Sequence, residues 1–234
     1  MIGWLVITAL VIGLTIIAWG AFHIQANFFL KVTHQGIATD RQVALTFDDG
    51  PHPVYTPQVL ELLDRYNVKA TFFCIGKNVR KHPDVVQRIH DTGHAVGNHS
   101  YSHARSIDFN GKTNWLEELQ QTDTAIGQVI GLRPIFFRPP YGVTTPHLAQ
   151  AIRMSGHRVI GWRVRPYDTL ESRSPAQIVR MILEKVKPGA IILLHDTHGR
   201  IVPILEQLLP QLHQHGYHLV TVSQLIDKHA YTEV

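Results

Sequence analysis

Apolar runs of strand length alternate with amphipathic segments of helix length from residue 42 onward. Seven of the apolar runs are predicted as strands: 43–47, 70–75, 94–97, 135–137, 158–162, 190–194 and 218–222. Six segments between them are predicted as helices: 57–66, 83–91, 114–130, 146–155, 175–186 and 202–215. Because strands and helices alternate strictly, we expect an α/β fold whose parallel strands are covered by helices.

Signals at the ends of the predicted helices agree with this pattern. Three helices begin with Ser or Thr before proline, as capped first turns do: Thr56-Pro57, Thr145-Pro146 and Ser174-Pro175. Five segments end in glycine, which favours the left-handed residue at a helix C-terminus: Gly93, Gly131, Gly156, Gly189 and Gly216. We find no internal repeat, so residues 42–230 are expected to form one domain.

The first part of the chain predicts a membrane anchor. Residues 2–22 carry no charged side chain, and a helix needs ~20 apolar residues to span a bilayer. Trp4 and Trp19 lie near the two ends of this run, as interfacial anchors do. A cleaved signal peptide is the alternative, but no Lys or Arg precedes the run and residues 18–20 form a poor cleavage site. We therefore expect an uncleaved anchor at 1–23, followed by a linker at 24–41.

Composition and charge disfavour a nucleic-acid-binding protein and exclude a disulfide within the chain. The 234 residues carry a net charge of +4 without a long basic run, which disfavours a nucleic-acid partner. No obligate protein partner is evident. The single cysteine, Cys74, lies in an apolar run, and one cysteine cannot form an intramolecular disulfide.

Lys31 is the basic residue nearest to the anchor, so the positive-inside rule weakly favours a cytoplasmic domain.

Polar side chains that could catalyse a reaction or bind a metal follow the predicted strands. Asp48 and Asp49 follow the first strand, and His99 and His103 follow the third. Three more residues stand at the ends of the fourth, fifth and sixth strands, in this order: Arg138, Asp168 and His195. In a parallel barrel all of these residues converge on the C-terminal rim of the strands, where such folds keep their active sites.

The residue types in this set suit a metal. Two adjacent carboxylates, Asp48 and Asp49, raise each other's pKa unless a partner such as a cation holds them ionised. On their own they also fit a surface turn before Gly50-Pro51. His99 and His103 together with one carboxylate form a set that suits zinc with an open position for water. Zinc lowers the pKa of bound water to roughly 7.

These residues lie in motifs that resemble the polysaccharide deacetylases of carbohydrate esterase family 4, which share the NodB homology domain. The resemblance covers residues 43–225, and four of the five family motifs are clear: Thr46-Phe47-Asp48-Asp49-Gly50, His99 to His103, Arg138-Pro139-Pro140-Tyr141 and Leu193 to His195. The fourth motif departs from the family's Asp-x-x-Asp-Trp, because Arg165-Pro166-Tyr167-Asp168-Thr169 stands in its place. The missing Trp leaves the shape of the groove open, and Trp162 is a candidate substitute.

The resemblance implies a role for each residue at the metal. Asp49, His99 and His103 would bind a divalent metal ion. Zinc is the expected ion, and Co²⁺ and Ni²⁺ are the alternatives. Asp48 would be the general base that takes a proton from a water on the metal, and Arg138 would hold Asp48.

The remaining implied roles concern the leaving group and the substrate. His195 would be the general acid that protonates the leaving amine, and Asp168 would orient and tune it. The backbone N–H of Tyr141 would bind the oxyanion, with Pro140 and Leu193 beside it at the substrate. We expect Asp196 only to cap the next helix, and we expect His198 to be a rim residue.

The fold implied is a distorted (β/α) barrel of about seven parallel strands after an N-terminal transmembrane helix. The activity implied is metal-dependent removal of N-acetyl groups from an N-acetylglucosamine polymer or oligomer, such as peptidoglycan, a chitin-like oligosaccharide or an exopolysaccharide. Deacylation of a lipid-linked sugar, de-O-acetylation of xylan and a non-catalytic carbohydrate-binding role stay open. Because the family's substrates lie outside the cytoplasm, we expect a single-pass membrane protein with an extracytoplasmic domain, on the periplasmic or outer face.

Overall fold

The structure, a computed structural model, describes residues 2–37 and 40–233. Its centre is a curved parallel sheet with the strand order β1-β7-β6-β4-β3-β2-β8, and β9 also pairs with β2. The strands are β1 (Val32–Thr33), β2 (Gln42–Asp48), β3 (Thr71–Cys74), β4 (Ala95–Asn98), β6 (Phe136–Phe137), β7 (Arg158–Ile160), β8 (Ile191–His195) and β9 (His218–Leu219). The predicted α/β class and the distorted parallel barrel are confirmed.

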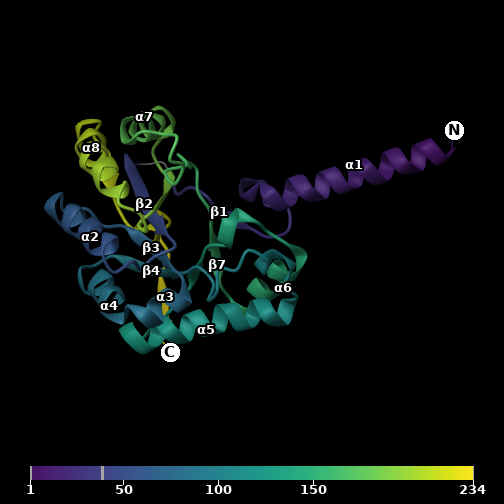
Figure 1. Cartoon of the computed structure of the whole chain (residues 1–234), viewed down its shortest axis with the longest axis horizontal. Helices are drawn as coiled ribbons and strands as arrows, with labels where there is room; N and C mark the ends of the chain where they lie inside the picture. Colours follow the sequence, from purple (N-terminus) through teal and green to yellow (C-terminus); the bar gives the residue numbers. More distant parts are fainter. Residues whose placement is uncertain (1, 38–39, 234) are drawn as a thin grey trace.

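Helices surround the outer face of this sheet (Figure 1). They are α2 (Tyr55–Arg65), α3 (Gly76–Lys81), α4 (Pro83–Asp91), α5 (Lys112–Ile130), α6 (Pro146–Ser155), α7 (Pro175–Lys185), α8 (Ile201–Gln214) and the short α9 (Val222–Leu225). The predicted Ser/Thr-Pro starts are real for two of these helices, because Thr145 and Ser174 accept a hydrogen bond from a backbone N–H of the first turn. Thr56 instead lies one residue inside α2, which begins at Tyr55.

The core lies on both sides of the sheet, because the central strands are buried along their length except at Gln42 and His195, which are partly exposed. The larger cluster fills the space between the sheet and helices α2, α4, α7 and α8, around residues such as Phe47, Leu63 and Leu208. A second cluster around Trp115, Phe137 and Leu193 lies toward α5 and α6. The sheet is therefore held rigidly, and the positions of its strand ends are fixed.

The ends of the seven predicted strands differ from the structure by up to three residues. The fourth is shortened to β6, because the preceding residues form β5 (Leu132–Pro134), which pairs with β10 (Tyr231–Glu233) in a separate antiparallel ribbon. The last strand stops at Leu219, because Thr221 starts α9 with a capping box to Gln224. Helix α3 was not predicted.

The segment expected to be a linker packs onto the domain instead. Its strand β1 pairs in parallel with β7, and the side chains of Ile24 and Val32 are buried in the second core cluster. The Gln25 side chain donates a hydrogen bond to the Trp162 carbonyl over 2.9 Å. Residues 24–37 therefore contribute the edge strand of the sheet, and they lie outside the domain predicted to begin at residue 42.

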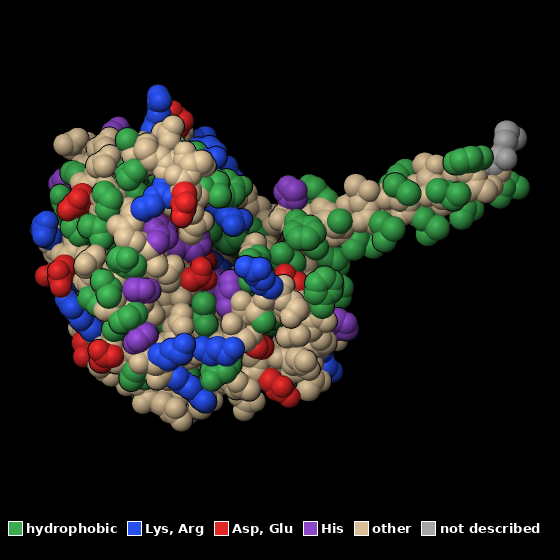
Figure 2. Space-filling model, viewed as in Figure 1, with side chains coloured by type: hydrophobic (Ala, Val, Ile, Leu, Met, Phe, Trp, Pro, Cys, Tyr) green, Lys and Arg blue, Asp and Glu red, His purple; other side chains and the backbone are tan. Residues whose placement is uncertain are grey.

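Helix α1 (Ile2–Phe22) projects from this edge, as Figures 1 and 2 show. It is the one helix within the described ranges that is long and apolar enough to cross a membrane, a test that an N-terminal signal sequence also passes. Its last turn touches the domain: Ala21 O accepts a hydrogen bond from Thr144 N–H over 3.0 Å, and Gly20 is buried against Phe28. The helix is thus joined to the domain by contacts as well as by the chain.

Candidate active site

The residues predicted at the strand ends come together at one rim of the sheet. Asp48 and His195 are the last residues of the paired strands β2 and β8, where they lie directly opposite one another in register. His99 follows β4, and Arg138 follows β6. Figure 2 shows histidine side chains gathered around a hollow near the middle of the visible face. The parallel topology therefore brings together residues that are up to 147 positions apart.

Asp49, His99 and His103 are arranged as a metal site. Asp49 Oδ1 lies 3.3 Å from Nε2 of His99 and 3.3 Å from Nε2 of His103, and the three ligand atoms all lie within 4.8 Å of one another. Ligands bound tetrahedrally to zinc at 2.0–2.1 Å are separated by ~3.3 Å. Asp49 Oδ1 is buried and has no hydrogen-bond partner among the described residues. The donor set and the spacing both fit a divalent cation.

The second nitrogen of His99 supports the same conclusion. His99 Nδ1 lies 2.8 Å from the Arg138 carbonyl, so it carries the proton and leaves Nε2 free as a ligand. Burial tends to raise the pKa of Asp49, but the nearby imidazoles of His99, His195 and His103 hold it well below its usual range. Asp49 is therefore an ionised carboxylate that faces basic nitrogens.

Strained backbone shapes this end of the sheet. Four non-glycine residues around the site have positive φ angles: Asp49 at 73°, Ser100 at 63°, His103 at 48° and Tyr141 at 59°. The left-handed region costs a non-glycine residue ~1–3 kcal/mol, and such residues cluster at functional sites. In this protein the left-handed conformations redirect the backbone at Asp49, after β2, and fold residues 99–103 so that His99 and His103 both face Asp49.

Arg138 fixes Asp48 in the wall of the site. Its guanidinium is fully buried and donates over 2.7 Å to Asp48 Oδ1 and to Thr46 Oγ1. It also donates to the carbonyls of Ile160 and Gly161 and lies over the Phe73 ring. Asp48 Oδ2 remains 3.8 Å from His99 Nε2. Asp48 therefore presents one oxygen to His99 Nε2, while the other is held by the arginine.

His195 and Asp168 form a second buried pair. Asp168 is fully buried and accepts from His195 Nδ1 over 3.0 Å and from the His195 backbone N–H over 2.8 Å. Burial tends to lower the pKa of His195, but the hydrogen bond and charge of Asp168, with the charges of Asp48 and Asp49, raise it to about 9. Burial tends to raise the pKa of Asp168, but its hydrogen bonds from His195 and His198 lower it to about 2. His195 Nε2 points toward Asp49, 4.0 Å from Oδ2.

The three residues predicted at the substrate differ in their placement. Tyr141 is 44% exposed, and its ring packs against His103 while its hydroxyl donates to the His103 carbonyl over 3.3 Å. Pro140 is buried in the same short turn. Leu193 lies in β8 within the second core cluster and is 2% exposed, so its side chain forms the floor beneath His195. Trp162 is also buried, under Gly142, which is not the position of an open groove wall.

Two contacts of the site were missed from the sequence. His198 Nε2 lies 3.4 Å from Asp168 Oδ2, so Asp168 sits between two histidines. Asp196 does not cap α8: it is fully buried, accepts from Thr56 Oγ1 over 2.5 Å and packs against Gly50. Burial raises the pKa of Asp196 to about 7, with hydrogen bonds from Thr56 and the backbone opposing this. Both contacts join segments far apart in the chain, for which sequence patterns carry no signal.

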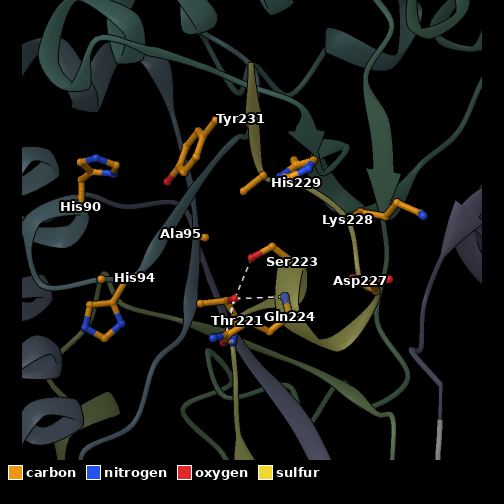
Figure 3. A pocket seen from close by; sticks show the side chains of 12 residues that line it. His90, His94, Ala95, Thr221, Ser223, Gln224, Asp227, Lys228, His229 and Tyr231 are labelled. Atoms are coloured by element: carbon orange, nitrogen blue, oxygen red, sulfur yellow. Dashed lines mark hydrogen bonds between the residues drawn. The ribbon is translucent and has the colours of Figure 1, made fainter. Parts of the chain in front are cut away.

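A separate pocket lies beside α9, away from this rim (Figure 3). His94 points into it and accepts a hydrogen bond from the Ala70 N–H. The Thr221 hydroxyl is bonded to Ser223 and to Gln224, as the dashed lines in Figure 3 show. These three residues thus bond to one another, and none of the residues predicted for catalysis lines the pocket.

Comparison with known proteins agrees with the geometry. A family model described as polysaccharide deacetylase matches residues 35–160. A peptidoglycan-N-acetylglucosamine deacetylase of Bacillus cereus is 35% identical over 190 residues, which are 79% of this chain and 68% of that protein. A peptidoglycan-N-acetylmuramic acid deacetylase of Bacillus subtilis is 37% identical over 78% of this chain, which spans 38% of that longer relative. A crystal structure of a peptidoglycan N-acetylglucosamine deacetylase superposes with a TM-score of 0.80 at 33% identity and covers 86% of this chain and 95% of that one.

Proposed function

The chain belongs to the polysaccharide deacetylase family, and from this premise we propose that it removes N-acetyl groups from N-acetylglucosamine residues of peptidoglycan. Membership makes it a hydrolase of amide bonds. The observation that carries the proposal is the meeting of Asp48, Asp49, His99, His103 and His195 at one rim. Similarity to peptidoglycan deacetylases over most of the chain favours this polymer over chitin-like and exopolysaccharide substrates.

We assign the metal to Asp49, His99 and His103. A divalent cation bound there lowers the pKa of a water molecule and polarises the acetyl carbonyl. Zinc is our first choice, because two imidazoles and one carboxylate are a ligand set of catalytic zinc sites. The hydrogen bond from His99 Nδ1 to the Arg138 carbonyl keeps the ring in the tautomer that can bind.

Asp48 acts as the general base in this scheme. Arg138, which also bonds to Thr46, holds one of its oxygens, and the other faces His99 Nε2. The attacking water gives a proton to this oxygen as its own oxygen forms a bond to the acetyl carbon. The guanidinium of Arg138 holds the carboxylate in this orientation until the proton arrives.

His195 acts as the general acid. Its Nδ1–H is held by Asp168, so its Nε2–H is the proton that points into the site. When the carbon–nitrogen bond breaks, Nε2 donates this proton to the leaving amine, and the products are acetate and a free amino sugar. The Tyr141 backbone N–H stabilises the negative charge that develops on the carbonyl oxygen.

We further propose that α1 stays attached and anchors the domain to a membrane. Removal of the last turn of α1 would take away the Ala21 carbonyl bonded to Thr144 and expose the Phe28 ring that packs on Gly20. Thr144 follows the turn that carries Tyr141, so the anchor supports a loop of the site. Because peptidoglycan lies outside the cytoplasm, we place the domain on the extracytoplasmic side.

A lipid-linked amino sugar is a second candidate substrate, favoured by the anchor. A domain that is bonded through Thr144 to the last turn of α1 is held close to the bilayer surface. Such a position suits an N-acetylated sugar that is still attached to its lipid carrier.

Acetate release tests the proposal. We expect the full chain in detergent to release acetate from intact peptidoglycan, with activity lost on chelation and restored by zinc. Mass spectrometry of muramidase digests will show whether glucosamine replaces N-acetylglucosamine. Activity on the lipid-linked precursor alone would support the second candidate. Binding of glycan without acetate release, by metal-loaded protein, would identify a non-catalytic carbohydrate-binding member.

A further inference from the structure

Charge is distributed unevenly between two parts of the sequence. Residues 1–39 and 124–167 contain no Asp or Glu, although they hold seven of the 22 Lys and Arg residues. The rest of the chain holds the other 15 together with all 18 acidic residues. The first part therefore has a net charge of +7 and the second part −3, although the whole chain is only mildly basic.

Three elements of these cationic segments, β1, β7 and α6, lie on the side of the domain where α1 leaves it, as Figure 1 shows. Two of the seven cations are already paired, Arg138 with Asp48 at the catalytic rim and Arg133 with Asp123. The last turn of α1 is held there by the Thr144–Ala21 hydrogen bond and by the Phe28 ring on Gly20. If α1 spans a bilayer, its contacts turn this side of the domain toward the membrane surface.

A groove of about 600 Å³ lies on this side, between residues 29–33, α6 and β7. Its floor is apolar and includes Phe29, Leu30 and Ile152. Its charged lining residues are Lys31, Arg153 and Arg158, all with exposed side chains. No acidic residue is among the described residues that line it.

We propose that this groove binds the headgroup and upper acyl chains of an acidic phospholipid from the membrane that holds α1. The three cations match a phosphate with a further negative charge or hydroxyl groups, and the apolar floor matches the acyl chains that follow. Leu30 and Lys31 come two and three residues after Phe28, which touches the last turn of α1. The groove is therefore at the depth where headgroups begin.

The lipid gives the domain a second attachment beside its helix. One helix fixes the distance of the domain from the bilayer but lets it tilt and rotate. A headgroup bound between α6 and residues 29–33 fixes the tilt, and with it the direction in which the catalytic rim opens. The inference rests on the membrane anchoring proposed above.

Spin-labelled lipids test this proposal on the full chain. We would reconstitute it in phosphatidylcholine vesicles with a trace of spin-labelled phosphatidylglycerol or spin-labelled phosphatidylcholine, and measure the immobilised fraction by electron paramagnetic resonance. Each cation near an anionic lipid contributes about fivefold in association. We expect phosphatidylglycerol to be preferred, the preference to fall about fivefold in Arg153→Gln, and the triple variant Lys31→Gln, Arg153→Gln, Arg158→Gln to lose it.

A matched triple variant in α7 and the turn after it, called the α7 variant, controls for total charge: Arg180→Gln, Lys185→Gln and Lys187→Gln, three exposed residues that do not line the groove. It should keep the wild-type lipid preference. Both triple variants should keep wild-type activity on soluble oligosaccharide, which shows that they fold. A preference that survives in the groove variant, or that is lost equally in the α7 variant, overturns the proposal.

Alkaline carbonate extraction separates this test from the anchoring itself. If the chain is extracted, the anchor assignment fails, and the lipid groove fails with it. If the chain resists extraction but shows no preference for phosphatidylglycerol, only the groove proposal fails.

Discussion

Asp168→Asn tests the chemical link between Asp168 and His195. The substitution keeps the size of a fully buried side chain but removes its charge and replaces one of its two acceptor oxygens, which face His195 Nδ1 and the His195 backbone N–H, with an NH₂ donor. In the wild type the hydrogen bond and the charge of Asp168 are the main causes that raise the pKa of His195 from 6.5 to about 9 against the effect of burial. Loss of an adjacent opposite charge lowers such a pKa by ~1–3.

The alkaline limb of kcat/KM should follow this change. A general acid works only while protonated, so the limb reports the His195 proton in the free enzyme. We expect it to move ~1–3 pH units lower in Asp168→Asn and the maximal rate on an amide to fall by ~10²-fold or more. A bound divalent cation lowers the His195 pKa in both proteins, so the prediction concerns the displacement between them.

The same pair contributes to stability over a defined range of pH. Because the folded-state pKa of His195 is raised, its contribution is complete below 6.5 and lost as the pH rises through about 9. Because the pKa of Asp168 is lowered from 3.8 to about 2, its contribution is present above 3.8 and lost as the pH falls through about 2. The His195 difference corresponds to ~3 kcal/mol. Asp168→Asn should therefore lower the free energy of unfolding most between about pH 4 and 6.5.

The assay compares acetate release from an N-acetylglucosamine oligomer with hydrolysis of an activated acetyl ester between pH 5 and 10. Metal content is measured on the same samples, because a lost metal would imitate a lost acid. Asp91→Asn is the control, since Asp91 is an exposed residue at the end of α4. An unshifted alkaline limb in Asp168→Asn, or equal losses on amide and ester, would refute the assignment of His195 as the acid that Asp168 tunes.

Three further predictions concern the metal, the rim loop and the N-terminal segment. Asp48→Asn should keep the metal and lose ~10²–10⁴ in rate, whereas Asp49→Asn should lose both; elemental analysis showing the reverse pattern would exchange the two roles. Gly142→Ala should destabilise the protein in urea unfolding by more than the ~1–3 kcal/mol that a positive φ alone costs, because Gly142 has a φ of 74° and its Cβ would also lie 2.4 Å from the Trp162 ring. Gly131→Ala is the control, since it has a similar φ of 71° but open space around it, and a cost as large as that of Gly142→Ala would mean that the ring plays no part. A chain trimmed to start at Val32 should have a free energy of unfolding ~1.5–3 kcal/mol lower than a chain that starts at His23, because it lacks the buried Ile24. Equal unfolding midpoints for the two chains would show that residues 24–31 are only a linker.

The sequence by itself determined the parallel sheet and the location of the site at the C-terminal ends of its strands. Buried strands read as short apolar runs, and in a parallel sheet the residue after each run must lie on the same rim. Asp48, Asp49, His99 and His195 could therefore be expected to meet before any coordinate was known. The motifs also predicted the family, which the comparisons confirm.

Only the tertiary structure decided which groups touch. The bonds from Thr56 to Asp196 and from Gln25 to Trp162 join residues 140 and 137 positions apart. No periodicity encodes such pairs, because they depend on how the curved sheet brings its edges and loops together. The apolar spacing of residues 24–37 was too irregular to predict a strand, yet β7 offers an open edge that residues 32–33 complete. Burial of Leu193 and Trp162 likewise follows from the layers packed around them, which composition alone does not reveal.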